Sequence, residues 1–233
     1  MKKGIAYGVG VGPGDPELMT LKAIRVIREN VVIAVPGNHP TESVAFKIAV
    51  QAIPELSQKV LVPMPMPMVK DRNALQSAHR KCADTLKPYL DQGKNVVYIT
   101  LGDPTVYCTF SYLHRLLESD GYAVELISGV PSFCAAAAAL HVPLAEWDET
   151  LHVIPAVHVQ DNPITQKGNY VLMKSAGRMR ETKSYLRDSG RDVFAAENCG
   201  MSNERLYGSV DEIPDDAGYF CLIIAKDTGK KPE

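Results

Sequence analysis

Short runs of apolar residues alternate along the chain with segments in which apolar residues recur every three or four positions. The short runs predict buried β-strands, and the longer spacing predicts helices with one apolar face. Strands are predicted at residues 5–11, 31–35, around 60, 95–100, 124–127, 152–154, 170–173, 193–196 and 219–225. Helices are predicted at residues 20–29, 42–52, 75–93, 110–118, 132–140 and 178–188. This alternation is typical of an α/β protein.

The pattern also predicts two α/β domains of similar size. Residues 1–120 are expected to form an N-terminal domain with a parallel sheet, and residues 124–233 a C-terminal domain with a mixed sheet. A ligand held between two such domains would lie where clefts usually form.

Prolines are expected to interrupt two of the predicted elements. The alternating Pro-Met segment at 63–68 cannot continue a central strand, because proline lacks an N–H donor, and Pro88 is expected to kink its helix.

Charge and composition narrow the class of partner. The formal net charge is −2, so no general field draws the chain to nucleic acid or to an anionic membrane. The five cysteines are widely spaced and form no Cys-x-x-Cys pair, which favours reduced thiols in the cytoplasm over disulfides or a zinc site. No run approaches the roughly 20 apolar residues of a membrane-spanning helix. The six histidines have no ligand spacing, so we expect no metal site.

The first motif that carries chemistry is Gly-Val-Gly-Val-Gly-Pro-Gly-Asp-Pro at residues 8–16, between a strand and a helix. A dinucleotide fingerprint fails in every register, because Pro13, Asp15 or Glu17 stands where the last glycine belongs. The spacing does match the loop of Rossmann-like methyltransferases, but residues 31–39 contain no acid to hold ribose hydroxyls. A tight turn without a ligand is the alternative.

Two further motifs follow predicted strands. Thr-Leu-Gly-Asp-Pro-Thr-Val-Tyr at residues 100–107 lies at the end of a buried strand, where open α/β sheets bind ligands. Asp103 could serve there as a turn residue, or could present a carboxylate to a ligand. Residues 128–144 carry Ser-Gly-Val-Pro-Ser followed by an alanine-rich helix, and Pro131 and Ser132 suit the helix start.

These three segments, in this order and spacing, resemble the tetrapyrrole methylase family. Its hallmarks are a Gly-x-Gly-Pro-Gly-Asp-x-x-Leu-x-Thr start, a Gly-Asp-Pro loop and a small-residue helix that opens the second half; here they occupy residues 10–20, 102–104 and 129–144. The resemblance covers essentially the whole chain. It implies two α/β domains, S-adenosylmethionine as methyl donor in the cleft between them, a tetrapyrrole substrate and a homodimer.

Within the family, the chain looks most like the methyltransferases that act on carbon 20 of precorrin-2 or cobalt-factor II. Uroporphyrinogen methylases carry an aspartate where this chain has Val35 and Pro36. That departure disfavours the uroporphyrinogen reaction and removes the best-known candidate base of the family, so we name no catalytic base. By resemblance, the cofactor is expected to contact Pro13, Leu101, Gly102, Asp103, Val106, Pro131, Ser132, Met173 and Cys199.

The expected chemistry requires little from the protein beyond alignment. The sulfonium of S-adenosylmethionine makes its methyl group electrophilic, and a reduced tetrapyrrole supplies an electron-rich carbon, so the enzyme must bring the two together. The substrate is a polycarboxylate, which needs local cations. Candidates are Lys70, Arg72, Arg80, Lys81, Lys174, Arg178 and Arg180.

Several other functions remain open from the sequence. Inside the family they are methylation of another corrin carbon or of uroporphyrinogen III, ribose methylation of ribosomal RNA, and diphthine synthesis. The RNA reaction would favour a basic face, which the charge pattern does not show. Outside the family, a nicotinamide oxidoreductase and a non-catalytic nucleotide-binding module are the alternatives. The presence of cobalt in the substrate is not encoded in any of these motifs.

Overall fold

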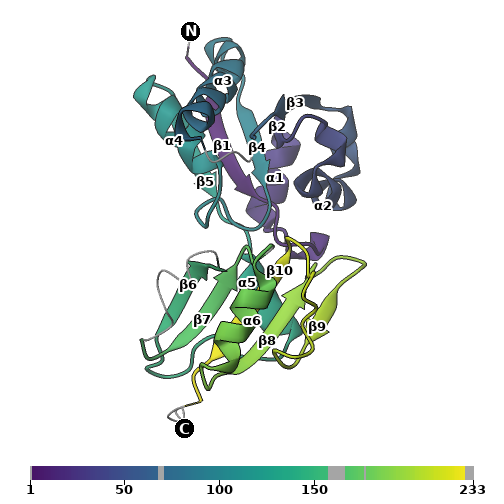
Figure 1. The fold of residues 1–233 in the computed structure, drawn as a ribbon. Helices are drawn as coiled ribbons and strands as arrows, with labels where there is room; N and C mark the ends of the chain where they lie inside the picture. The colour runs from purple at the N-terminus through teal and green to yellow at the C-terminus, as the bar shows by residue number, and fades with distance from the viewer. Residues whose placement is uncertain (1, 68–70, 157–165, 176, 229–233) are drawn as a thin grey trace. The chain divides into compact units, whose positions relative to one another are not determined.

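The computed structural model describes residues 2–67, 71–156, 166–175 and 177–228 (Figure 1). The chain divides into two compact units, Met1–Pro131 and Ser132–Glu233, and each contains its own β-sheet. The predicted α/β class is therefore confirmed. In the described part of the chain, no helix has the length and apolar character needed to cross a membrane.

The N-terminal unit contains a parallel sheet with the strand order β3-β2-β4-β1-β5. Its strands are β1 (Ile5–Gly10), β2 (Val32–Pro36), β3 (Val60–Met64), β4 (Val96–Thr100) and β5 (Ala123–Ile127). Its helices are α1 (Leu21–Glu29), α2 (Val44–Ala52), α3 (Arg72–Asp91) and α4 (Phe110–Ser119), with short 3-10 helices η1 (Pro16–Leu18), η2 (Pro40–Glu42) and η3 (Pro54–Gln58). The carboxyl ends of the strands lie at one edge of the sheet, where such folds bind ligands.

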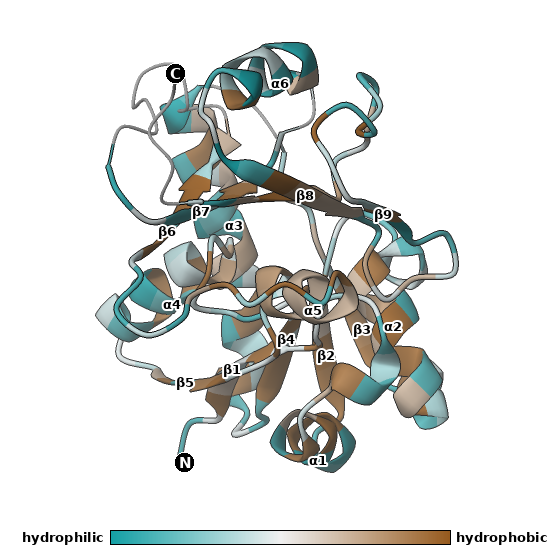
Figure 2. Cartoon of the chain, turned by 90° about the horizontal axis from the view of Figure 1, so that it is seen from below, coloured by the Kyte–Doolittle hydropathy of each residue, from teal (hydrophilic) through white to brown (hydrophobic). Residues whose placement is uncertain are grey.

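Apolar side chains cover both faces of this sheet. Helices α1 and α2 bury Ile27 and Phe46 against one face, and α3 and α4 bury Leu86 and Leu113 against the other. Figure 2 shows the hydrophobic colour concentrated on the central strands β2 and β4. Because these strands are buried on both sides, they read as continuous apolar runs, which is why the sequence predicts them well.

Strand β5 belongs to the N-terminal sheet. It pairs with the outer edge of β1, where Ala6 lies opposite Val124 and Val9 opposite Ile127. The structural division after Pro131 therefore differs from the sequence-based boundary at residues 120–123. The physical reason is that β5 pairs with β1 over five residues and so makes β1 an inner strand of the parallel sheet.

Both prolines singled out from the sequence lie at the margins of their elements. Pro63 lies in β3, but β3 is an edge strand, where a missing N–H donor breaks no ladder hydrogen bond. Helix α3 continues through Pro88 to Asp91, and the kink expected at Pro88 stays a prediction. Pro88 lies in the last turn before the helix ends, so few backbone hydrogen bonds follow it.

The C-terminal unit contains a mixed sheet with the strand order β6-β7-β10-β8-β9. Its strands are β6 (Leu151–Pro155), β7 (Asn169–Met173), β8 (Asp192–Glu197), β9 (Arg205–Tyr207) and β10 (Cys221–Lys226). Helix α5 (Ser132–Ala139) packs its alanines on one face, and α6 (Met179–Arg187) buries Met179 and Leu186 on the other. Since β7 and β8 are both antiparallel to β10, their carboxyl ends lie at the same edge of the sheet.

Glu149 fastens the segment before β6 to the sheet of the C-terminal unit. Its Oε2 atom accepts hydrogen bonds from Lys226 Nζ at 2.8 Å, Asn169 Nδ2 at 2.8 Å and the Glu146 amide at 2.9 Å. These donors, Lys226 foremost, lower the pKa of Glu149 from its ordinary value of 4.5 to about 2. The carboxylate therefore contributes to stability as long as it stays ionised.

A Glu149→Gln variant is expected to melt at a lower temperature than the parent protein at pH 7. Because the folded pKa lies below the unfolded one, the contribution is complete above about pH 4.5 and is lost as the pH falls toward 2. The gap between the two melting temperatures should therefore close over that range. Glu125→Gln, on an exposed β5 position without an ion pair among the described residues, is the control. A gap that stays constant down to pH 3 would contradict the assignment.

Candidate functional site

Three loops meet at the carboxyl edge of the N-terminal sheet, after β1, β4 and β5. Gly12 and Gly102 form an antiparallel bridge, with N–O distances of 2.8 Å and 3.3 Å between their amides and carbonyls. A Cβ atom built on Gly10 would lie 2.8 Å from the Gly129 nitrogen, closer than real Cβ atoms approach. The glycines predicted from the sequence therefore bring three backbones into direct contact.

Asp103 joins the second loop to the third. Its Oδ2 atom accepts a hydrogen bond from the Gly129 amide at 3.0 Å, and its Oδ1 atom accepts from the Thr105 amide at 2.7 Å and the Thr105 hydroxyl at 2.5 Å. The side chain is 7% exposed. Both carboxylate oxygens thus face protein donors, so the structure favours the turn-forming role of Asp103 over direct presentation to a ligand.

Thr20 connects the first loop to the third. Its hydroxyl caps helix α1 by accepting from the Ala23 amide at 3.2 Å, and it lies 3.2 Å from the Ser128 carbonyl oxygen, to which it donates. The sequence predicted a helix that begins at Thr20 but not this second contact, because the partner is distant along the chain. Together with Asp103, Thr20 fixes the three loops to one another.

The expected cofactor contacts divide between the two units. Those in the N-terminal unit lie on these three loops, and they are Pro13, Leu101, Gly102, Asp103, Val106 and Pro131. Pro13, Gly102 and Asp103 are buried, whereas Leu101, Val106 and Pro131 are half-buried. The geometry gathers this first group at one sheet edge, and their contact with a cofactor stays a prediction.

The remaining expected contacts lie in the C-terminal unit. Ser132 is the first residue of α5, Met173 is the last residue of β7, and Cys199 follows β8. Met173 and Cys199 pack against the apolar cluster that α5 covers, so these two lie on the same face of the sheet. The position expected for the cofactor, in a cleft between the domains, also stays a prediction.

Left-handed backbone conformations mark the ends of the strands that carry these residues. Tyr107, Lys174 and Asn198 adopt φ angles of 46°, 61° and 53°. They follow the Gly-Asp-Pro loop, Met173 and Glu197 respectively. Non-glycine residues rarely adopt this conformation, and it is concentrated at ligand-binding segments when the surrounding structure holds it in place.

Cys199 is a protonated thiol at neutral pH. Burial, reinforced by the nearby Glu204 carboxylate, raises the pKa of Cys199 to about 12. The Glu204 carboxylate also accepts a hydrogen bond from the Gly200 amide at 2.7 Å and so fixes the turn after β8. Since the thiolate is the nucleophilic form of cysteine, Cys199 can line a site without reacting with an electrophile.

Glu197 is a buried residue of this region that sequence reasoning missed. Its Oε1 atom accepts from the Gly218 amide at 2.6 Å, and its Oε2 atom accepts from the Tyr207 hydroxyl at 3.1 Å. These contacts anchor the strand end that carries Cys199. The segment Ala-Glu-Asn-Cys at residues 196–199 was a weak signal for it, but the partners of Glu197 lie on other segments.

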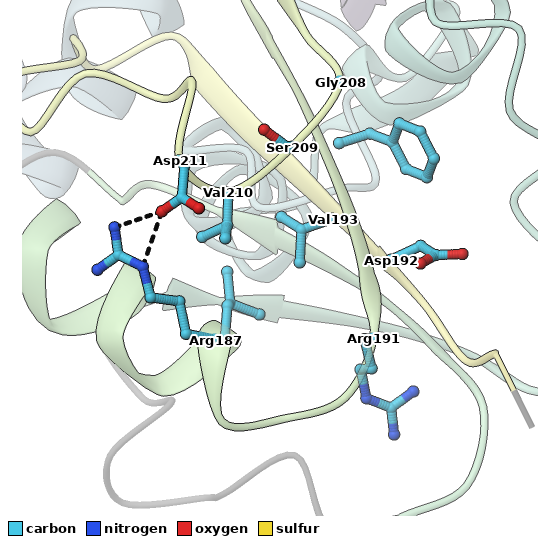
Figure 3. A pocket seen from close by; sticks show the side chains of 10 residues that line it. Arg187, Arg191, Asp192, Val193, Gly208, Ser209, Val210 and Asp211 are labelled. Carbon is cyan, nitrogen blue, oxygen red and sulfur yellow. Dashed lines mark hydrogen bonds and ion pairs between the residues drawn. The ribbon is translucent and has the colours of Figure 1, made fainter. Parts of the chain in front are cut away.

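A cavity of about 460 Å³ lies elsewhere in the C-terminal unit (Figure 3). It is lined from the start of β8, the end of α6 and the segment after β9, including Arg191, Asp192 and Ser209. Arg187 donates two hydrogen bonds to Asp211 at its rim. Because Cys199 follows the opposite end of β8, this cavity is separate from Cys199. Among the described residues, no cluster of His, Cys, Asp or Glu could hold a metal ion.

Comparison with known proteins identifies the class. The model of the family described as Tetrapyrrole (Corrin/Porphyrin) Methylases matches residues 6–214. A solved structure of a cobalt precorrin-4 methyltransferase shares the fold, with a TM-score of 0.71 and 19% identity over 95% of this chain and 94% of that chain. The chain therefore belongs to the tetrapyrrole methylase family, as its three motifs predicted.

Individual relatives indicate a more specific reaction within the family. A probable cobalt-precorrin-2 C(20)-methyltransferase from Methanocaldococcus jannaschii is 33% identical over 225 residues, which cover 94% of this chain and 95% of that protein. The cobalt-precorrin-2 C(20)-methyltransferase of Salmonella typhimurium is 28% identical over 95% of each chain. The predicted resemblance to carbon-20 methyltransferases is thus confirmed.

Proposed function

We propose that the protein transfers the methyl group of S-adenosylmethionine to carbon 20 of precorrin-2 or of its cobalt-containing counterpart, in cobalamin biosynthesis. The observation that carries the proposal is the 33% identity, over nearly the full length of both chains, to the probable carbon-20 methyltransferase of M. jannaschii. The structure adds that β2 ends in Val35 and Pro36, so no carboxylate occupies the position where uroporphyrinogen methylases carry an aspartate.

The residues at the candidate site fit S-adenosylmethionine. The glycine-bearing loops bring their backbones together at the sheet edge, and Leu101, Val106 and Met173 are half-buried apolar side chains suited to an adenosine. The cofactor supplies an activated methyl group. Cys199, with its pKa raised to about 12, does not compete for that methyl as a thiolate would.

In this reaction the protein's own residues act by positioning. Asp103 and Thr20 fix the loops, and Glu197 and Glu204 fix the turn that carries Cys199. Rigid placement of both reactants is the largest contribution expected for a transfer between an electrophilic methyl group and an electron-rich carbon. We name no residue as the base that accepts the proton released from carbon 20.

The proposal is tested by incubating the protein with labelled S-adenosylmethionine and, in parallel, with precorrin-2, cobalt-factor II and uroporphyrinogen III. We expect one methyl group per turnover, located at carbon 20 by mass spectrometry and NMR, and much slower turnover of uroporphyrinogen III. Preferred methylation of uroporphyrinogen III at carbons 2 and 7 would refute the carbon-20 assignment. Calorimetry with S-adenosylhomocysteine and with NAD, of which only the first should bind, separates this function from a nicotinamide oxidoreductase.

We further propose a cytoplasmic homodimer that binds no nucleic acid. None of the five cysteines forms a disulfide, as expected of reduced thiols, and the net charge of −2 gives no overall attraction to nucleic acid. Trp147 supports an interface between copies of the chain, because it is fully exposed in a turn that Glu149 holds in place. A rigid exposed tryptophan is typical of contact surfaces between proteins.

A further inference from the structure

Tyr112 lies in the first turn of α4, close to the sheet edge that carries the three loops. The helix begins at Phe110, whose ring occupies the space above Gly8 in β1, where a Cβ atom would collide with it. Gly8 lies two residues before Gly10, which contacts the other loops. Tyr112 is 49% exposed despite its size. A large aromatic side chain is therefore displayed from the first turn of the helix that follows the Gly-Asp-Pro loop.

Two neighbours hold the Tyr112 ring in one orientation. The His79 imidazole from α3 stacks on it, with ring centroids 4.5 Å apart and an angle of 10° between the planes. The guanidinium carbon of Arg115 lies 5.3 Å from the centroid of the same ring. Burial lowers the pKa of His79, so the imidazole is neutral at pH 7. Arg115 is therefore the charged member of this trio.

Arg115 and Tyr112 keep hydrogen-bond donors that a ligand could use. Arg115 uses Nε to donate to the Ser111 carbonyl at 3.2 Å, which leaves its two terminal nitrogens. Throughout the described residues, Arg115 forms no ion pair and the Tyr112 hydroxyl forms no hydrogen bond. The nearest acid on the same helix, Glu118, is 3.0 Å from His114 instead.

Two other cations of α3, Arg80 and Lys87, are already paired with acids. Arg80 Nη1 and Lys87 Nζ both lie 2.5 Å from Asp120 Oδ2, and Lys87 is also 2.6 Å from Asp84. Arg80 was a candidate for binding substrate carboxylates, and its charge is already paired with Asp120. Arg115 is a better candidate, because its charge is exposed and its side chain is already oriented by the ring of Tyr112.

We propose that Arg115 and Tyr112 together bind one carboxylate side chain of the tetrapyrrole substrate. The terminal nitrogens of the guanidinium and the phenol hydroxyl donate hydrogen bonds to the carboxylate, and His79 supports the ring from α3. A guanidinium recognises a carboxylate through two parallel N–H donors, and the tyrosine hydroxyl adds a third. This inference rests on the proposed function and assigns a substrate-binding role to this surface.

The test measures steady-state kinetics of Arg115→Gln, Arg115→Lys and Tyr112→Phe with the tetrapyrrole substrate. We expect Arg115→Gln to raise KM about ten-fold and to leave kcat within about two-fold, because the contact holds ground and transition states alike. Arg115→Lys should recover part of the loss. The Tyr112→Phe and Arg115→Gln effects should be less than additive, since both groups bind one carboxylate.

Three further measurements separate this proposal from its alternatives. The affinity for S-adenosylhomocysteine should be unchanged in all variants, and Arg25→Gln, which breaks a surface pair with Glu29 on α1, should leave KM unchanged. The KM of the parent enzyme should rise with salt more steeply than that of Arg115→Gln. An active parent enzyme with an unaltered KM in Arg115→Gln overturns this inference alone, whereas an inactive parent enzyme overturns the proposed function. Loss of the dimer on sedimentation, without a change in KM, would instead assign the surface to a protein interface and overturn the inference.

Discussion

A Gly129→Ala variant is expected to lose at least a hundred-fold in affinity for S-adenosylhomocysteine, about 2.7 kcal/mol of binding free energy. A Cβ atom at this position would lie 2.9 Å from the Gly10 backbone and would also overlap the Gly102 carbonyl oxygen. These neighbours are backbone atoms, so none can rotate away as a side chain would. The loops must separate, and the proposed cofactor contacts at Gly102 and Pro131 move with them.

The control for this variant is Gly208→Ala. A Cβ atom there would meet only the Glu212 carboxylate oxygens, at 3.8 Å and 3.9 Å, which is ordinary van der Waals distance. Neither Gly129 nor Gly208 has a left-handed backbone, so the two variants differ in steric conflict and not in backbone strain. Gly10→Ala should behave like Gly129→Ala. A folded Gly129→Ala protein, verified by circular dichroism, that binds S-adenosylhomocysteine with unchanged affinity would remove these loops from the cofactor site.

Local sequence patterns predict the doubly buried strands well and the half-exposed ones poorly. Strand β4 is buried at every position, and its continuous apolar run is unmistakable. Strand β5 is exposed at Ala123, Glu125 and Leu126. The sequence pattern therefore predicts the strand, but it does not predict to which sheet the strand belongs. Its membership in the N-terminal sheet follows from pairing with β1, which is remote in sequence and leaves no local signal.

Strand β9 is too short to be predicted from the sequence. It spans Arg205–Tyr207, and of these only Tyr207 is buried. Three residues with one apolar contact produce no periodicity that distinguishes a strand from a loop. The strand forms because Ala195 to Glu197 of β8 offer an edge for it to pair with. Tertiary context therefore decides its conformation.

The sequence predicts which loops form the candidate site, but it does not predict the hydrogen bonds between those loops. The motifs locate Gly102, Asp103 and Pro131, because glycine and proline mark special backbone positions. The Asp103–Gly129 hydrogen bond depends on β4 and β5 both flanking β1, and this adjacency is a property of the whole sheet.

The ion pairs of candidate cations are hidden from the sequence for a related reason. Arg180, a candidate for substrate binding, lies 3.1 Å from Asp215, and its partner is far along the chain. Lys70 lies outside the described residues. A cation can be counted from the sequence, but its availability depends on which acids the fold brings beside it, so Arg115 emerges only from the structure.

An Asp103→Asn variant is expected to lose about five-fold to a hundred-fold in kcat/KM. The two carboxylate oxygens accept three donor groups, from Gly129 and from the amide and hydroxyl of Thr105. An amide has one acceptor oxygen, so its NH2 group must face an N–H or O–H donor on one side. The resulting unsatisfied buried donor costs about 1–3 kcal/mol, and it either opens the contact with the third loop or distorts the second.

Thr105→Val is the graded comparison, because it removes only the hydroxyl donor and leaves the amide bond and the Gly129 contact. Its loss in kcat/KM should stay within a few-fold. Amide hydrogen exchange at Gly129 then separates a positioning role from direct participation. If Asp103 acts as a clamp, faster exchange at Gly129 should accompany the loss of activity in Asp103→Asn. Lost activity with unchanged exchange would mean that the carboxylate acts on the reactants themselves, and retained activity would mean that the loops keep their geometry without it.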